Sequence, residues 1–178
     1  MGGVFAANMT GNTVLAGIEL AQGHLVAAGR HLTPLVAFFL GAMVARLMLR
    51  LLRTPKPGLA LEAAILAAVS FLPVDREVAV LVVALAMGVQ ASAITQFGGN
   101  AVSTVVVTST LARTADAALD RLWPRQSSDP PAVANPRLLT LTWLGYLAGA
   151  VIGALLLQVT LWPLLVPAAL LLVVLLAV

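Results

Sequence analysis

The chain alternates long apolar runs with short polar or proline-containing connections. Most of the runs approach the ~20 residues that a helix needs to cross a bilayer, whereas half-buried strands would alternate every second residue. This pattern predicts a bundle of membrane helices. The predicted apolar segments are residues 4–21, 32–53, 59–72, 78–94, 101–119, 138–158 and 161–178. We expect the fifth to be a half-helix or an unwound stretch, because an open strand edge is not tolerated in lipid.

The connections are short and polar, with one exception. Residues 22–31 read as a polar connection in which His24 and His31 are solvated loop residues and not metal ligands. Residues 54–58 form a tight basic turn. Residues 121–137 are polar and proline-rich, which predicts a mobile linker.

Two prolines fall inside predicted helices. Pro34 is expected in the first turn of its helix, where the missing N–H costs nothing, and Pro167 is expected to kink the last helix.

A cluster of neutral polar side chains lies inside the first apolar segment and has an echo in the second half. Each cluster follows a Gly-Gly pair, Gly2-Gly3 or Gly98-Gly99. Lipid cannot satisfy Asn and Thr side chains or backbone freed from a helix, so both clusters should face protein or a water-filled path. The predicted path residues are Asn8, Thr10, Gly11, Asn12, Thr13, Gln90, Thr104, Thr108, Ser109 and Thr110.

Composition supports the membrane interpretation. Hydrophobic residues make up 61% of the chain and charged residues 10%, with a mean hydropathy of +1.03. Soluble domains carry about 25% charged residues. The net charge of +3 does not indicate nucleic-acid binding, because the basic residues stand at the ends of apolar runs and not in one patch. Cysteine is absent, which excludes disulfides and thiolate chemistry.

The two halves of the chain align weakly with each other, and charge then constrains topology. If each half crosses three times, eight Lys and Arg residues share one side and Arg30 and Arg76 occupy the other. The positive-inside rule favours this arrangement. The predicted fold is an all-α membrane protein, a polytopic helical bundle of two inverted three-span repeats with broken helices, residues 1–74 and 75–178.

Two further features predict packing. Gly145, Gly149 and Gly153 repeat at four-residue spacing and, with Gly41, indicate close helix packing, against a helix of the same chain or of another copy. Glu62 lies in an apolar run, and two roles are open for it. One is an ion-pair partner of Arg53 or Lys56, and the other is a coupling site.

Three stretches together resemble the YoaK family of bacterial polytopic membrane proteins, which carry a domain of unknown function. They are residues 5–14 (Phe-Ala-Ala-Asn-Met-Thr-Gly-Asn-Thr-Val), 86–91 (Ala-Met-Gly-Val-Gln-Ala) and 108–111 (Thr-Ser-Thr-Leu). The resemblance implies an inner-membrane location and about six spans. Family members usually carry an apolar helix before the first motif, which this chain is expected to lack. Ser109 replaces a usual glycine, and Ala91 a common asparagine.

Two functions fit these observations. One is a transporter or channel that carries a small solute or ion through paired discontinuous helices, and the other is a structural or assembly protein whose polar motifs only pack helices. Intramembrane hydrolysis would need paired catalytic or zinc-binding groups, which the spans do not offer, so no enzyme, cofactor or metal is expected. The expected partners are the lipid bilayer, the solute and a second copy of the chain, with no nucleic acid.

Overall fold

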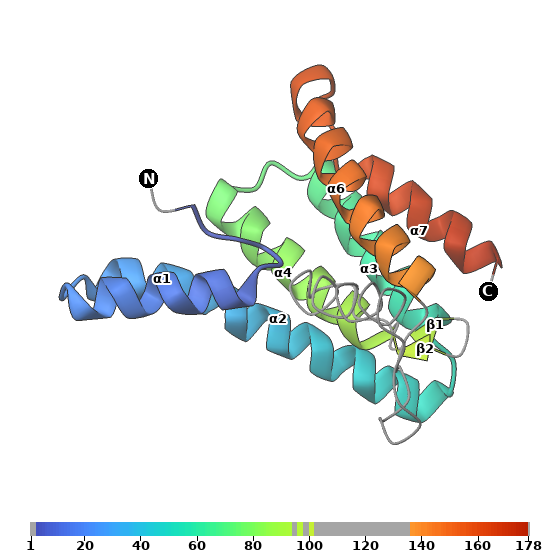
Figure 1. Ribbon diagram of the computed structural model, residues 1–178, viewed down its shortest axis with the longest axis horizontal. Helices are drawn as coiled ribbons and strands as arrows, with labels where there is room; N and C mark the ends of the chain where they lie inside the picture. The colour runs from blue at the N-terminus through green and yellow to red at the C-terminus, as the bar shows by residue number, and fades with distance from the viewer. Residues whose placement is uncertain (1–2, 94–95, 98–99, 102–135, 178) are drawn as a thin grey trace, which may run out of the picture. The chain divides into compact units, whose positions relative to one another are not determined.

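The computed structural model describes residues 3–93, 96–97, 100–101 and 136–177, which are drawn as ribbon in Figure 1. They form two compact units, one of Met1–Ile94 with Trp162–Val178 and one of Thr95–Leu161. The first unit contains α1 (Met9–Ala21), α2 (Leu25–Leu52), α3 (Lys56–Phe71), α4 (Arg76–Ala93) and α7 (Leu165–Ala177). The second contains β1 (Gln96–Phe97), β2 (Asn100–Ala101) and α6 (Pro136–Val159).

Helices α2 and α4 are the centre of the first unit and run in the same direction, and α3 runs back on the other side of α4 (Figure 1). They cross at two glycines. A Cβ atom on Gly41 would overlap the carbonyl oxygen of Leu85, and one on Gly88 would overlap the carbonyl oxygen of Phe38. Only glycine allows the two backbones to approach this closely, which is how membrane helices gain packing energy without a hydrophobic driving force.

Helix α2 begins seven residues earlier than predicted. The polar connection is only Gln22–His24, and Gly23 makes the turn with a positive φ of 79°. Residues 25–31 join the helix because its buried positions continue toward the N-terminus at helical spacing. Those buried positions are Ala28, His31, Pro34, Gly41 and Ala45.

The early start of α2 corrects two predictions. His31 is not a solvated loop residue, since it lies in the helix and is 3% exposed. Pro34 lies in the helix interior and not in the first turn. His24 remains an exposed residue of the connection, where its Nδ1 lies 2.9 Å from Glu19 Oε2.

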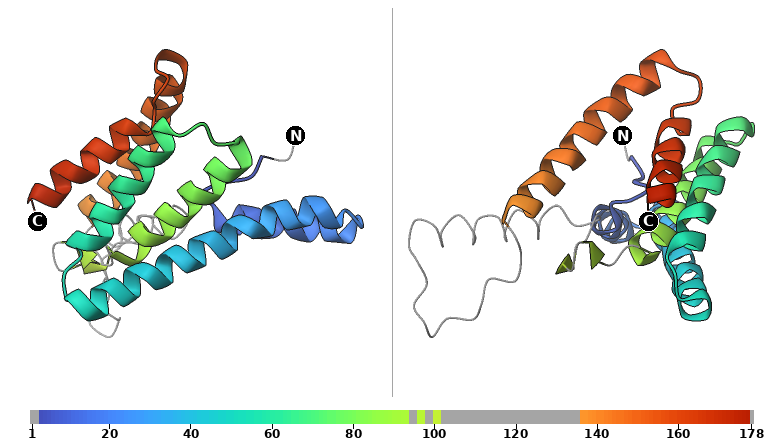
Figure 2. Two further views of the ribbon diagram at one scale, coloured as in Figure 1. Left: turned by 180° about the vertical axis from the view of Figure 1, so that it is seen from behind. Right: turned by 90° about the vertical axis from the view of Figure 1, so that its right-hand side faces the viewer.

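Helix α7 packs along α3, and the back view in Figure 2 shows the two side by side. Their contact forms an apolar core to which α4 adds Ala86. Its buried members are Leu59, Ala63, Leu66, Ala86, Ala168 and Leu171. Pro167 was predicted to kink the last helix, but α7 starts only at Leu165, so Pro167 lies in the first turn, where proline is tolerated.

The second unit, within its described residues, consists of one long helix and one short pair of strands. Residues Gln96–Phe97 pair antiparallel with Asn100–Ala101. On α6, a Cβ atom added at Gly145, Gly149 or Gly153 would meet nothing within 4 Å. Within the described part of the second unit, this glycine stripe therefore has no close-packing partner.

Large apolar side chains cover the outside of the helices. Among the described residues, three helices are long and apolar enough to cross a membrane: Leu25–Leu52, Arg76–Ala93 and Leu141–Val159. On α2 alone, Val36, Phe39, Met43 and Leu47 are all more than half exposed. Soluble monomers rarely present an apolar surface of this extent, whereas a bilayer requires one. The predicted helical membrane protein is confirmed at this level.

Candidate functional site

The polar motif of the N-terminal segment marks the start of α1. Asn8 is the N-cap residue, and its Oδ1 accepts a hydrogen bond from the backbone N–H of Gly11 at 3.0 Å. A Cβ atom on Gly11 would lie 2.7 Å from Asn8 Nδ2, so a larger residue would displace the cap. Asn8 and Gly11 are therefore explained by helix capping.

Asn12 holds the non-helical segment that precedes α1. Its Oδ1 accepts from the Phe5 backbone N–H at 2.9 Å, and its Nδ2 donates to the Phe5 carbonyl at 2.7 Å. Asn12 is 0% exposed. In an apolar environment an unwound backbone must find internal partners, and one amide side chain supplies both of them to Phe5.

The two threonines of the motif differ. Thr13 Oγ1 donates to the Met9 carbonyl at 2.9 Å, which is a bond within its own helix. Thr10 is exposed, and its hydroxyl has no hydrogen bond in the described part of the chain. The motif thus uses most of its hydrogen-bonding groups on its own backbone, with Thr10 as the exception.

A cavity of about 540 Å³ lies beside this unwound segment, at the N-terminal ends of α2 and α4. It was not predicted from the sequence. The segment contributes Gly3 and Val4 to its wall, and the two helices contribute the rest. The lining residues from the helices are Val26, Gly29, Arg30, Thr33, Pro34, Arg76, Glu77, Val80 and Leu81.

The α2 wall of the cavity is built around Pro34. Proline has no N–H, so the carbonyl of Arg30, four residues earlier, loses its helical donor. Thr33 Oγ1 donates to this carbonyl at 3.2 Å and so replaces the missing bond. This threonine–proline pair explains how an interior proline is accommodated in α2.

Charged groups lie at the exposed side of the cavity. Arg30 Nε is 3.5 Å from Glu77 Oε1, with side chains 63% and 73% exposed. Arg76 is also exposed, and no ion pair of Arg76 is found among the described residues. Deeper in the wall, Val80 and Leu81 are half-buried and Pro34 is buried. The charged side chains of the lining are therefore more exposed than the apolar Pro34, Val80 and Leu81.

Of the other predicted path residues, the structure describes Gln90, which is not brought to helix α1. Gln90 is half-buried on α4, and α1 contacts only α2 among the described helices. Gln90 therefore does not meet Thr10 or Asn12. The remaining four, Thr104, Thr108, Ser109 and Thr110, lie outside the described residues.

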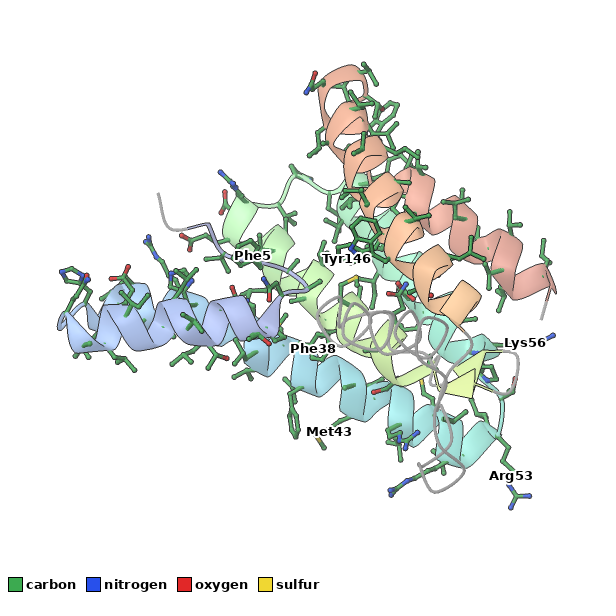
Figure 3. All side chains as sticks on the ribbon, in the orientation of Figure 1. Phe5, Phe38, Met43, Arg53, Lys56 and Tyr146 are labelled. Carbon is green, nitrogen blue, oxygen red and sulfur yellow. The ribbon has the colours of Figure 1, made fainter. Side chains whose placement is uncertain are left out.

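Glu62 does not make the ion pair that was one of the two roles expected for it. It is 1% exposed in α3, and its Oε2 has no hydrogen-bond partner in the described part of the chain. Neither Arg53 nor Lys56, both labelled at one end of the first unit in Figure 3, pairs with it. Gly58, one turn earlier on α3, would place a Cβ atom 3.0 Å from Ala93 Cβ, so this side of the helix faces α4. The side chain is directed into the bundle and not toward the basic turn.

Four residues of the cavity mouth and wall escaped the sequence analysis: Arg30, Thr33, Arg76 and Glu77. The available signal was the Arg-x-x-Thr-Pro order of residues 30–34, which places a hydroxyl beside the carbonyl that proline leaves unpaired. No group of three or more His, Asp or Glu residues that could hold a metal is found within the described ranges.

Fold and surface together define a helical membrane protein with a polar-mouthed cavity at one end of its first unit. A family model described as Protein of unknown function (DUF1275) matches residues 1–177. UPF0700 transmembrane protein YoaK of Bacillus subtilis (strain 168) is 33% identical over 166 residues, covering 87% of this chain and 73% of that protein. The chain therefore belongs to this YoaK family, which confirms the resemblance. No solved structure matches it.

Proposed function

We propose that this protein carries a small solute across a bacterial plasma membrane, and that the cavity beside the unwound segment is part of the solute path. One observation carries the proposal: a cavity of about 540 Å³ is walled by non-helical backbone that a buried asparagine holds in place. Non-helical backbone at membrane depth is tolerated where it is buried in protein or lines a cavity, and transporters build their binding sites from such segments.

The role of Asn12 in this proposal is to position the wall and not to touch the solute. Both of its polar atoms are bonded to Phe5. Phe5 directly follows Gly3 and Val4, which line the cavity, so the asparagine fixes the backbone next to the site. Among the motif residues, Thr10 is the one with a free hydroxyl for solute or water.

The architecture that we propose for transport is a multi-pass bundle of two inverted three-span repeats. Residues 1–74 form one repeat and residues 75–178 the other, each with a discontinuous helix. The gap between the Gly-Gly pair and α1 supports this for the first repeat, because residues 3–8 are not helical. The charge distribution supports an orientation with eight basic residues on the cytoplasmic side. We propose no enzymatic activity.

Cysteine accessibility tests the path, because the chain has no native cysteine. We expect Thr33→Cys, in the cavity wall, to react with a membrane-impermeant thiol reagent in sealed vesicles. Val36→Cys is the matched control, one turn along the same helix on a 58% exposed apolar position outside the cavity lining. Equal protection of the two cysteines would contradict a water-filled cavity.

Flux is the second arm of this test. Proteoliposomes containing the protein should swell in iso-osmotic small solutes faster than empty liposomes. Reaction of Thr33→Cys with the thiol reagent should slow that swelling, and reaction of Val36→Cys should not. Identical swelling with and without protein, over a panel of neutral and anionic solutes, would remove the transport proposal and leave a membrane protein with a closed cavity.

A structural or assembly role is the second candidate. It is favoured by the local use of the motif, in which Asn8, Asn12 and Thr13 all bond to their own segment. The two functions differ in what they require of Thr10. A solute path that extends from the cavity to the motif would use its free hydroxyl, whereas helix packing would not.

A further inference from the structure

We propose that the cavity binds the anionic head of a small amphiphile, a carboxylate or a phosphate ester, at Arg30 and Arg76, with the apolar part of the ligand against Pro34, Val80 and Leu81. This deepens the proposed function by naming the class of ligand. The inference rests on the proposed function in one respect, namely that this cavity is the ligand site. The binding step itself needs no transport.

The charge balance at the mouth carries the first part of the argument. Among the described residues, three charged side chains line the cavity, two guanidinium groups and one carboxylate. Glu77 is engaged by Arg30 through a single contact of 3.5 Å at Nε, which leaves the other donors of that guanidinium uncommitted. With Arg76 added, the mouth has one positive charge in excess, so it favours an anion.

The guanidinium groups also determine which kind of anion the cavity favours. Their planar fork of N–H donors matches the two oxygens of a carboxylate or phosphate and forms shorter, stronger bonds than neutral donors do. Both helices that line the cavity begin at this end, α2 at Leu25 and α4 at Arg76. The positive ends of their dipoles add to the attraction for negative charge.

The wall behind the charges makes the site amphiphilic. Pro34 contributes an apolar ring and no N–H donor, and the freed carbonyl of Arg30 is already satisfied by Thr33. Val80 and Leu81 complete a surface that offers dispersion contacts and no polar partner. A volume of about 540 Å³ exceeds what an inorganic anion fills and lies in the range of small-molecule sites.

The ligand chemistry has two sources, a free solute or the head group of a membrane lipid. Equilibrium binding to the purified full-length chain in neutral detergent separates them. The probes are short-chain phosphatidylglycerol, short-chain phosphatidylcholine with the same tails, and inorganic phosphate as competitor. Bound probe is counted by native mass spectrometry.

We expect phosphatidylglycerol to bind and phosphatidylcholine to bind about tenfold more weakly, because its head group carries no net charge. If inorganic phosphate displaces the bound lipid, the site accepts a free oxyanion. If phosphate does not displace it, the lipid is the source. Both results support the shared chemistry, and equal binding of the two lipids would overturn it.

Variants with opposite expected effects on the affinity make the test specific. Arg76→Gln should weaken phosphatidylglycerol binding about tenfold, and Arg76→Lys less than that, because lysine keeps the charge and loses the fork. Glu77→Gln should strengthen binding about threefold, since it removes the competing carboxylate from Arg30. Arg46→Gln, which changes an exposed arginine of α2 outside the cavity lining, is the control and should have no effect.

All these changes are at exposed positions, so they should not disturb folding. An unfolding temperature equal to that of the unmodified protein will verify this for each variant. Unchanged binding in both Arg76→Gln and Glu77→Gln would overturn the inference. That result would leave the proposed function intact if Thr33→Cys is still labelled in vesicles. If Thr33→Cys is protected while lipid binding stays normal and charge-dependent, the proposed function fails and the inference about the ligand stands.

Discussion

Two polar regions lie side by side in the first unit and use their hydrogen-bonding groups differently. In the motif, Asn8 and Asn12 bond to backbone a few residues away. At the cavity mouth, Arg76 has no ion pair among the described residues, and Arg30 makes one long contact to Glu77. The motif is more polar in sequence, yet the mouth has the free polar capacity. In a membrane protein, groups whose hydrogen bonds are not satisfied internally are the better indication of a ligand site.

The largest expected effect comes from Asn12→Leu. The substitution keeps a similar size but leaves the N–H and carbonyl of Phe5 without partners next to a buried position. Two unpaired backbone groups should lower the free energy of unfolding by about 2–4 kcal/mol. Reversible unfolding in mixed micelles measures this change.

Thr10→Val is the matched control for Asn12→Leu, two residues away in the same motif. Because the Thr10 hydroxyl has no hydrogen bond in the described part of the chain, stability should change by less than about 0.5 kcal/mol. If Thr10→Val abolishes proteoliposome swelling while the protein stays folded, the motif also contacts solute. If Asn12→Leu is as stable as wild type, the tether of Phe5 is not what holds the cavity wall.

Asn8→Ala should produce a smaller loss, about 1 kcal/mol, because it removes one N-cap bond to Gly11 at the start of α1. The same measurement applies. Asn8→Asp is the conservative control and should retain the cap, since a carboxylate also accepts from the backbone and is favoured at a helix N-terminus. A loss in Asn8→Asp equal to that in Asn8→Ala would assign a different role to Asn8.

The sequence predicted the bounds of the helices better than it predicted the contacts between them. Apolar run length is read directly, so α3, α4 and α6 begin and end within about three residues of their predicted bounds. The start of α2 was wrong because Gln22, His24 and His31 were taken as one polar stretch, although His31 lies at helical spacing from Ala28 and Pro34. Helical periodicity, and not local polarity, decided that boundary.

Glycine shows why contacts are harder to predict. The stripe of Gly145, Gly149 and Gly153 has the stronger pattern, yet it meets nothing within 4 Å in the described part of its own unit. Gly41 on α2 and Gly88 on α4 allow a close backbone approach from a single glycine each. A glycine pattern indicates that a helix can pack closely against another. Which helix that partner is depends on long-range geometry that a single sequence does not contain.

Glu62 belongs to neither polar region, because it is buried and its Oε2 is unpaired in the described part of the chain. Replacing it with methionine removes an unsatisfied group and keeps the volume, so Glu62→Met should raise the free energy of unfolding by about 1 kcal/mol. Glu62→Gln is the control, since it keeps a buried polar group and should not stabilise. A marked loss in Glu62→Met would mean that the carboxyl group has a partner beyond the described residues.

The smallest expected effect concerns the Arg30–Glu77 pair. Both side chains are mostly exposed and their contact is 3.5 Å long, so solvent screens the attraction. Glu77→Gln should change the free energy of unfolding by at most about 0.5 kcal/mol, while the affinity for an anionic amphiphile increases. A stability effect without an affinity effect would make this pair structural, like the motif, and would remove the contrast between the two regions. An affinity effect alone would place the function of the first unit at the cavity mouth.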